Sequence, residues 1–105
     1  MKQIIDNDVS SLGDKKCYLL FYFTASWCGP CQRIKPMIEK LSEGLDESKI
    51  EIYTVDIDSN DELADKYNIR SVPTFLLILQ DECIDQCSGA DITKVHQLLK
   101  KNITQ

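Results

Sequence analysis

Apolar residues recur along the chain with two different periods, and their alternation predicts an α/β domain. Residues 19–23 are apolar and aromatic throughout, which is typical of a strand buried on both faces. Apolar residues then recur every three or four positions, which predicts a helix from about Gly29 to Gly44 with one buried face. Its expected core residues are Ile34, Met37, Ile38, Leu41 and Leu45. Pro36 lies inside this helix, so we expect a kink there.

The rest of the chain continues the alternation of strands and helices. It predicts strands at 2–6, 17–24, 50–57, 74–79 and 82–88 and helices at about 59–68 and after Asp91. In 50–57 the core candidates are Ile50, Ile52, Val55 and Ile57. Helical crossovers require parallel neighbours, and the short turn at 80–81 adds an antiparallel pair. The order of elements therefore predicts an α/β fold with a central mixed β-sheet flanked by helices.

Cys28 and Cys31 lie where the strand at 17–24 ends and the long helix begins. If Cys28 caps the helix, its sulfur faces the unpaired N–H groups of the first turn, which favour a thiolate over a thiol. Pro30 costs little in a first turn, where its missing N–H has no intrahelical partner. The two intervening residues place Cys31 within bridging distance, and so small a loop leaves a disulfide reducible. The spacing predicts a redox-active pair.

Length and charge limit the function further. A chain of 105 residues fits one domain, spanning 1–105. Its net charge of -5 argues against a nucleic acid or an anionic membrane as the main partner. Residues 1–16 lack the continuous apolar segment of a signal peptide, and no apolar run approaches the ~20 residues of a membrane span. We therefore expect a cytoplasmic protein.

Three further cysteines have no such obvious use. Cys17 is expected to be a small buried residue, and Cys83 and Cys87 are expected to pack on one face of the last strand. A regulatory or intermolecular thiol is the alternative for the latter two. A zinc site is disfavoured, because tetrahedral zinc needs four ligands and the chain has no second C-x-x-C or His pair.

The motif Trp27-Cys28-Gly29-Pro30-Cys31 resembles the active site of the thioredoxin family. Other blocks match family landmarks in the same order, namely Asp56-Ile57-Asp58, Tyr67-Asn68-Ile69-Arg70-Ser71-Val72-Pro73-Thr74 and Ser88-Gly89-Ala90. The resemblance implies the thioredoxin fold and a protein disulfide reductase. It makes Cys28 the nucleophile of dithiol–disulfide exchange and Cys31 the resolving thiol.

The same resemblance implies partners and a substrate site. It predicts a cis bond at Val72-Pro73 beside the dithiol, and a monomer that needs no bound cofactor. A thioredoxin reductase drawing on NADPH would reduce the disulfide, and disulfide-containing proteins would be the substrates. These roles belong to electron transport and cell redox homeostasis. The implied substrate-binding residues are Trp27, Gly29, Pro30, Ile57, Val72, Pro73, Gly89 and Ala90. Core packing is the alternative for Trp27.

The chain departs from the family pattern at two positions. Family members usually carry a buried Asp six residues before the first cysteine and a buried Lys on the next strand, where this chain has Tyr22 and Thr54. Tyrosine, with a reference pKa of ~10, cannot act as a base at neutral pH. Two alternative functions therefore remain: a specialised thioredoxin-like oxidoreductase with few partners, and a non-enzymatic binding subunit. The intact cysteine pair argues against the binding subunit.

Overall fold

A five-stranded sheet forms the centre of the protein, whose computed structural model describes residues 1–103. The elements are β1 (Lys2–Ile4), β2 (Tyr18–Thr24), α1 (Gly29–Glu43), β3 (Ile50–Asp56), α2 (Asp61–Lys66), β4 (Thr74–Leu79), β5 (Glu82–Ser88) and α3 (Ile92–Asn102). The strand order is β1-β3-β2-β4-β5, with β1, β3 and β2 parallel and β4 and β5 antiparallel to their neighbours. The predicted mixed sheet is confirmed.

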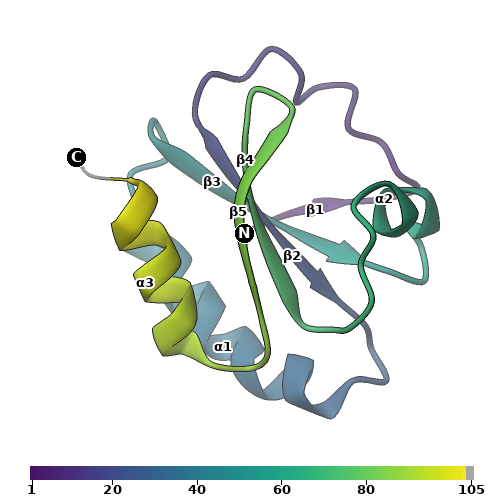
Figure 1. The fold of residues 1–105 in the computed structure, drawn as a ribbon. Helices are drawn as coiled ribbons and strands as arrows, with labels where there is room; N and C mark the ends of the chain where they lie inside the picture. Colours follow the sequence, from purple (N-terminus) through teal and green to yellow (C-terminus); the bar gives the residue numbers. More distant parts are fainter. Residues whose placement is uncertain (104–105) are drawn as a thin grey trace.

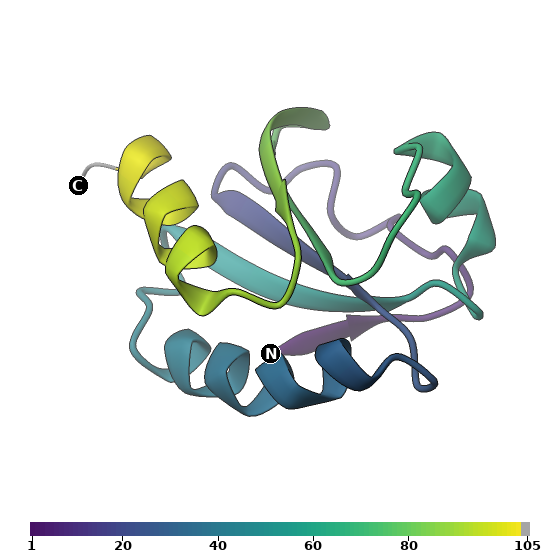
Figure 2. The same ribbon diagram turned by 60° about the horizontal axis from the view of Figure 1, so that its bottom comes forward.

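Helices cover both faces of this sheet. Helices α1 and α3 lie side by side against one face, and α2 lies on the opposite side, as Figures 1 and 2 show. Ile34 and Ile38 of α1 share one core cluster with Val95 of α3, whereas Leu63 of α2 belongs to the other. The sheet is therefore the middle of three layers.

Strand β2 is the central strand, and it is buried on both faces as the sequence predicted. Leu20 and Tyr22 point toward the cluster beneath α1 and α3. Leu19, Phe21 and Phe23 point toward the opposite cluster. A strand with both faces buried loses contacts on two sides if it shifts, so β2 holds a fixed register between β3 and β4. It therefore gives whatever follows it a rigid starting point.

Helix α1 begins after Cys28 and is capped at Gly44, close to the predicted bounds. Ile34 and Ile38 are buried, but the prediction that Met37 belongs to the core is wrong, because its side chain is 52% exposed. Ile34 and Ile38 lie one turn apart on the face that packs on the sheet, and Met37 is rotated from that face toward solvent. Pro36 is inside the helix as expected.

The other helices and strands differ from prediction mainly at their ends. Strand β1 stops at Ile4, because Asp6 and Asn7 adopt left-handed backbone conformations and turn the chain. Strand β3 stops at Asp56, so Ile57 is half-buried beyond the strand and not a core residue within it.

A β-bulge in β5 overturns the prediction that Cys83 and Cys87 share one face. Cys87 pairs with Phe75 of β4, and Cys83 pairs with Ile78, with a shift of register between these pairs. One extra residue on β5 reverses the alternation of its side chains. Cys87 therefore packs partly against the core beneath α1 and α3, whereas Cys83 lies exposed on the other side of the sheet. Cys83 is not a packing residue.

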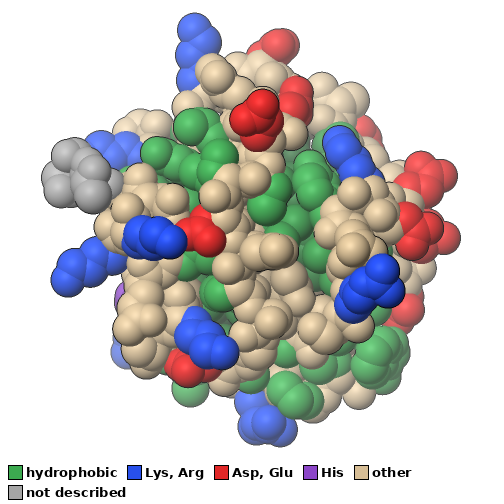
Figure 3. All heavy atoms as spheres, viewed as in Figure 1, with side chains coloured by type: hydrophobic (Ala, Val, Ile, Leu, Met, Phe, Trp, Pro, Cys, Tyr) green, Lys and Arg blue, Asp and Glu red, His purple; other side chains and the backbone are tan. Residues whose placement is uncertain are grey.

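The face seen in Figure 3 carries acidic and basic side chains interspersed with one another. Some of the charged side chains of the protein pair with one another: Glu51 contacts both Lys2 and Lys15, and Asp85 contacts Lys101. Within residues 1–103, no helix combines the length and the apolar character needed to cross a bilayer.

Asn60 joins the N-terminal segment to the end of β3. Its side chain is fully buried and makes no cap to α2. Instead its amide donates to the carbonyls of Ile4 and Asp56, each at 2.9 Å, and its oxygen accepts from the Asn7 N–H at 2.7 Å. The side-chain oxygen of Asn7 in turn accepts a hydrogen bond from the Leu63 N–H in the first turn of α2, at 3.0 Å. One buried side chain, that of Asn60, thus bonds three main-chain groups from two separate segments of the chain.

We expect Asn60→Ala to lower the free energy of unfolding by about 2–4 kcal/mol, because the Ile4 carbonyl and the Asn7 N–H lose the hydrogen bonds that Asn60 makes to them. Denaturant melts followed by circular dichroism measure this loss. Gln97→Ala, which removes an exposed side-chain amide in α3, is the control and should change the same quantity by no more than ~0.5 kcal/mol. Equal losses in the two variants would contradict this role of Asn60.

Candidate active site at the start of helix α1

Cys28 and Cys31 form a disulfide across the first turn of α1, with their Cα atoms 5.3 Å apart. Cys28 has an extended backbone and is the N-cap of the helix, and its carbonyl accepts the first helical bond from Gln32 at 3.1 Å. Gly29 and Pro30 complete the turn. The predicted position of the pair, and its ability to bridge, are confirmed.

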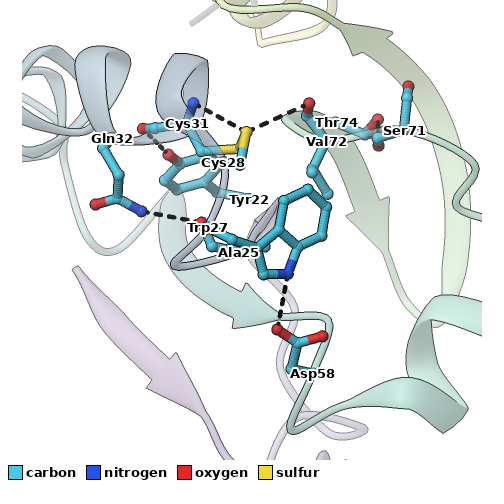
Figure 4. The surroundings of a disulfide bond; sticks show 10 residues. All are labelled: Tyr22, Ala25, Trp27, Cys28, Cys31, Gln32, Asp58, Ser71, Val72 and Thr74. Atoms are coloured by element: carbon cyan, nitrogen blue, oxygen red, sulfur yellow. Dashed lines mark hydrogen bonds between the residues drawn. A yellow bond between two sulfur atoms is a disulfide. The ribbon is translucent and has the colours of Figure 1, made fainter.

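The Cys28 sulfur accepts a hydrogen bond from the Cys31 N–H at 3.2 Å (Figure 4). No acidic residue lies in the first turn of α1. The positive end of the helix therefore acts on this sulfur without an opposing carboxylate from its own turn. Once the disulfide is reduced, the same N–H stabilises a thiolate on Cys28.

A loop before β4 faces the pair from across the site. The Val72 carbonyl lies 3.7 Å from the Cys28 sulfur, and the Val72–Pro73 bond is cis, as the resemblance predicted. Two hydrogen bonds hold the loop: the Thr74 hydroxyl donates to Ser71, and the Gly89 N–H donates to the Pro73 carbonyl. The loop therefore places a main-chain carbonyl beside the sulfur.

The cysteines and the residues predicted to bind substrate differ in how far they are exposed to solvent. Cys28 is 5% exposed and Cys31 is fully buried. Gly29, Pro30, Gly89 and Ala90 are exposed, Ile57 and Val72 are half-buried, and Pro73 is buried. Ala25, Ile57 and Val72 pack against the disulfide itself. The structure thus brings the segments at 27–31, 57, 72–73 and 89 together at one edge of the molecule.

Trp27 stands beside the disulfide and is 67% exposed, so the alternative of core packing for this side chain is wrong. Its indole N–H donates to the Asp58 carboxylate at 3.0 Å. This bond fixes the ring next to Cys28, as Figure 4 shows. Asp58 was not among the predicted site residues. Its pairing depends on the end of β3 meeting the end of β2, and nothing in the local sequence shows that.

Tyr22 and Gln32 also support the pair in ways that the sequence did not reveal. The Tyr22 hydroxyl donates to the Cys31 carbonyl at 2.7 Å, and the Gln32 amide donates to the Ala25 carbonyl at 3.0 Å. Burial is the main cause that raises the pKa of Tyr22 above its usual range, so the group is a neutral phenol at pH 7. This agrees with the expectation that Tyr22 is no base.

The remaining cysteines lie in less activating surroundings. Burial raises the pKa of both the Cys83 and Cys87 thiols, and the Asp85 carboxylate adds to the rise. Cys17 is half-buried against the cluster that includes α2. Over residues 1–103, no group of three or more His, Cys, Asp or Glu side chains is placed to hold a metal ion. The chemistry concentrates at Cys28 and Cys31.

Comparison with known proteins agrees with this geometry. The family model described as Thioredoxin matches residues 3–104. The chain belongs to the thioredoxin family. It is 32% identical to a thioredoxin from Coprinus comatus over 98% of this chain and 99% of that protein.

Solved thioredoxin structures share the fold as well. The crystal structure of Fasciola hepatica thioredoxin has a TM-score of 0.88 and 34% identity, covering 96% of this chain and 98% of that one. Schistosoma mansoni thioredoxin has a TM-score of 0.84 and 41% identity, covering 98% and 93%. The thioredoxin fold predicted from sequence is confirmed.

Membership of the thioredoxin family gives the pair its activity. Thioredoxins are protein disulfide oxidoreductases that exchange a dithiol with a disulfide and need no bound cofactor. In this chain the redox-active group is the Cys28–Cys31 disulfide.

We expect iodoacetamide at pH 7 to modify Cys28 of the reduced protein about ten times faster than Cys83, although Cys83 is the exposed thiol. The helix end stabilises the Cys28 thiolate, whereas the raised pKa keeps Cys83 protonated. Labelling of Cys83 and Cys87 should rise only as the pH passes above an ordinary thiol pKa. Peptide mass spectrometry across a pH series measures this order, and faster labelling of Cys31, Cys83 or Cys87 at pH 7 would contradict it.

Proposed function

We propose that this chain is a single-domain, monomeric, cytoplasmic thioredoxin that acts as a general protein disulfide reductase. A thioredoxin reductase drawing on NADPH returns it to the dithiol form, which places it in electron transport and cell redox homeostasis. The observation that carries the proposal is the hydrogen bond from the Cys31 N–H to the Cys28 sulfur at the start of α1. It gives the two cysteines unequal roles.

In the first step the Cys28 thiolate attacks one sulfur of a partner disulfide. A bond forms between Cys28 and that sulfur, the partner's own disulfide breaks, and the departing sulfur leaves as a thiolate that takes up a proton. In the second step the Cys31 thiol gives its proton to water or to the departing partner thiolate, and its sulfur attacks the Cys28 sulfur. The Cys28–Cys31 bond forms, the bond between Cys28 and the partner breaks, and the second partner sulfur leaves as a thiolate that takes up a proton. Two electrons have then passed from the dithiol to the partner.

A substrate segment is held by main-chain and apolar contacts around Cys28. Among residues 1–103, the Val72 N–H makes no main-chain hydrogen bond, and the Val72 carbonyl lies 3.7 Å from the Cys28 sulfur. An extended substrate segment pairs with these groups as an added strand. Its side chains contact the rim formed by Trp27, Gly29, Pro30, Ile57, Val72, Pro73, Gly89 and Ala90.

A specialised oxidoreductase with few partners is the second candidate. The observation that favours it is the neutral Tyr22 phenol behind Cys31, where most family members carry a carboxylic acid. A changed group behind the resolving cysteine alters the rate of exchange and its potential. Steady-state rates with several unrelated disulfide proteins distinguish the two, since a general reductase turns over all of them.

We expect Cys28→Ser to abolish reduction of insulin disulfides in an assay coupled to NADPH through a thioredoxin reductase, because no nucleophile remains at the helix start. NADPH absorbance follows the reaction. Cys83→Ser, which alters an exposed thiol in β5, is the control and should retain the parent's rate. Loss of activity in Cys83→Ser with activity left in Cys28→Ser would reverse this assignment.

We expect Cys31→Ser to accumulate a covalent complex with the same substrate. Cys28 still attacks, but no thiol is present to break the resulting bond. Non-reducing electrophoresis should show a band that dithiothreitol removes, and peptide mapping should place the link on Cys28. A link found on Cys17, Cys83 or Cys87 would show that Cys28 is not the nucleophile.

A further inference from the structure

We infer that Tyr22 is a positioning residue for the second step of exchange: its hydroxyl holds the backbone of Cys31 so that the resolving sulfur stays aimed at Cys28. The inference rests on the proposed roles of Cys28 and Cys31. Tyr22 acts through the Cys31 main chain, whose carbonyl accepts its hydroxyl.

The hydrogen bond joins the central strand of the sheet to the reactive turn. Tyr22 lies in β2, is fully buried, and stacks on Phe75 of β4 with ring centroids 5.0 Å apart and planes 8° from parallel. Its hydroxyl reaches the Cys31 carbonyl at 2.7 Å (Figure 4). A ring held between neighbouring strands has one available direction for its hydroxyl, so the bond defines where Cys31 sits.

The start of α1 needs such support because Pro36 interrupts its ladder of hydrogen bonds. Pro36 lies inside the helix and has no N–H to donate. The carbonyl four residues before Pro36, that of Gln32, therefore lacks its usual helical partner, and this carbonyl is adjacent to that of Cys31. The Tyr22 hydroxyl adds a bond at the turn where the helix ladder is interrupted.

Alignment matters most in the second step. There the Cys31 sulfur must approach the Cys28 sulfur in line with the bond to the partner, as that bond breaks and the partner thiolate departs with the electron pair. A small loss of alignment within a preorganised site lowers the rate of such a step steeply. The first step uses the Cys28 sulfur, the Cys31 N–H that stabilises it and the incoming disulfide, but not the Cys31 sulfur. It is therefore much less sensitive to the direction in which the Cys31 sulfur points.

The two steps can be timed separately. Reduced protein is mixed with a small peptide disulfide, the reaction is stopped in acid at successive times, and intact mass spectrometry measures the reduced, mixed-disulfide and oxidised forms. In Tyr22→Phe, which keeps the stacked ring and removes only the hydroxyl, we expect formation of the mixed disulfide within about twofold of the parent. We expect its resolution to be about five- to tenfold slower.

Tyr18→Phe is the matched control. Tyr18 also lies in β2, and its hydroxyl also donates to a helix carbonyl, that of Asn102 at 3.2 Å, at the end of α3 far along the strand from the cysteines. Its loss costs a comparable hydrogen bond and should leave both steps at the parent's rate. If Tyr22→Phe fails to fold, Phe75→Leu takes its place, since it removes the stacking partner that orients the hydroxyl and should likewise slow resolution alone.

Three outcomes are distinguishable. The inference is supported if Tyr22→Phe resolves the mixed disulfide more slowly but forms it at the parent's rate, while Tyr18→Phe carries out both steps at the parent's rate. Equal slowing in both variants, or parent-like resolution in a folded Tyr22→Phe, overturns it and leaves the proposed function standing. A parent protein that forms no mixed disulfide on Cys28 overturns the proposed function itself.

Discussion

The hydrogen bond between the Cys31 N–H and the Cys28 sulfur is where the fold and the chemistry meet. A helix must satisfy the N–H groups of its first turn, and serine, threonine, aspartate or asparagine usually does so. Here a cysteine does. The interaction that stabilises the helix start is therefore the one that stabilises a nucleophile. Any change that moves the start of α1 affects stability and reactivity together.

Several segments of the structure hold the start of α1 in position. Strand β2 enters the turn from the centre of the sheet, where burial on both faces prevents it from sliding. The loop at Val72 approaches from the far side and is tied to β5 through Gly89. The Trp27–Asp58 bond adds a link to the end of β3. Three strand ends thus converge on one helix start, a common place for ligand sites in α/β proteins.

Periodicity and local motifs predicted most of this from sequence, and they failed where a third element intervened. The buried strand at 19–23, the helix from Gly29 and the cysteine pair are set by residues close together in the sequence, so local patterns were enough to predict them. Asn60 has the sequence position of a helix cap, yet its side chain serves β1 and the segment at Asn7. The bulge that separates Cys83 from Cys87 and the Trp27–Asp58 bond likewise depend on neighbouring strands. Such features are set by tertiary contacts, and local sequence carries no signal for them.

The two departures from the family pattern make sense once they are seen together. Tyr22 and Thr54 are register partners on β2 and β3, and each donates its hydroxyl to a main-chain carbonyl: Tyr22 to Cys31 and Thr54 to Lys2. A buried carboxylate beside a buried amine must be kept paired, and removing one alone leaves an uncompensated charge. Two hydroxyls with separate carbonyl partners carry no such dependence. The sheet beneath the cysteine pair carries no charge at these two positions, so neither residue adds a charge to the one that the end of α1 presents to Cys28. The task that remains for Tyr22 is to hold Cys31 in place.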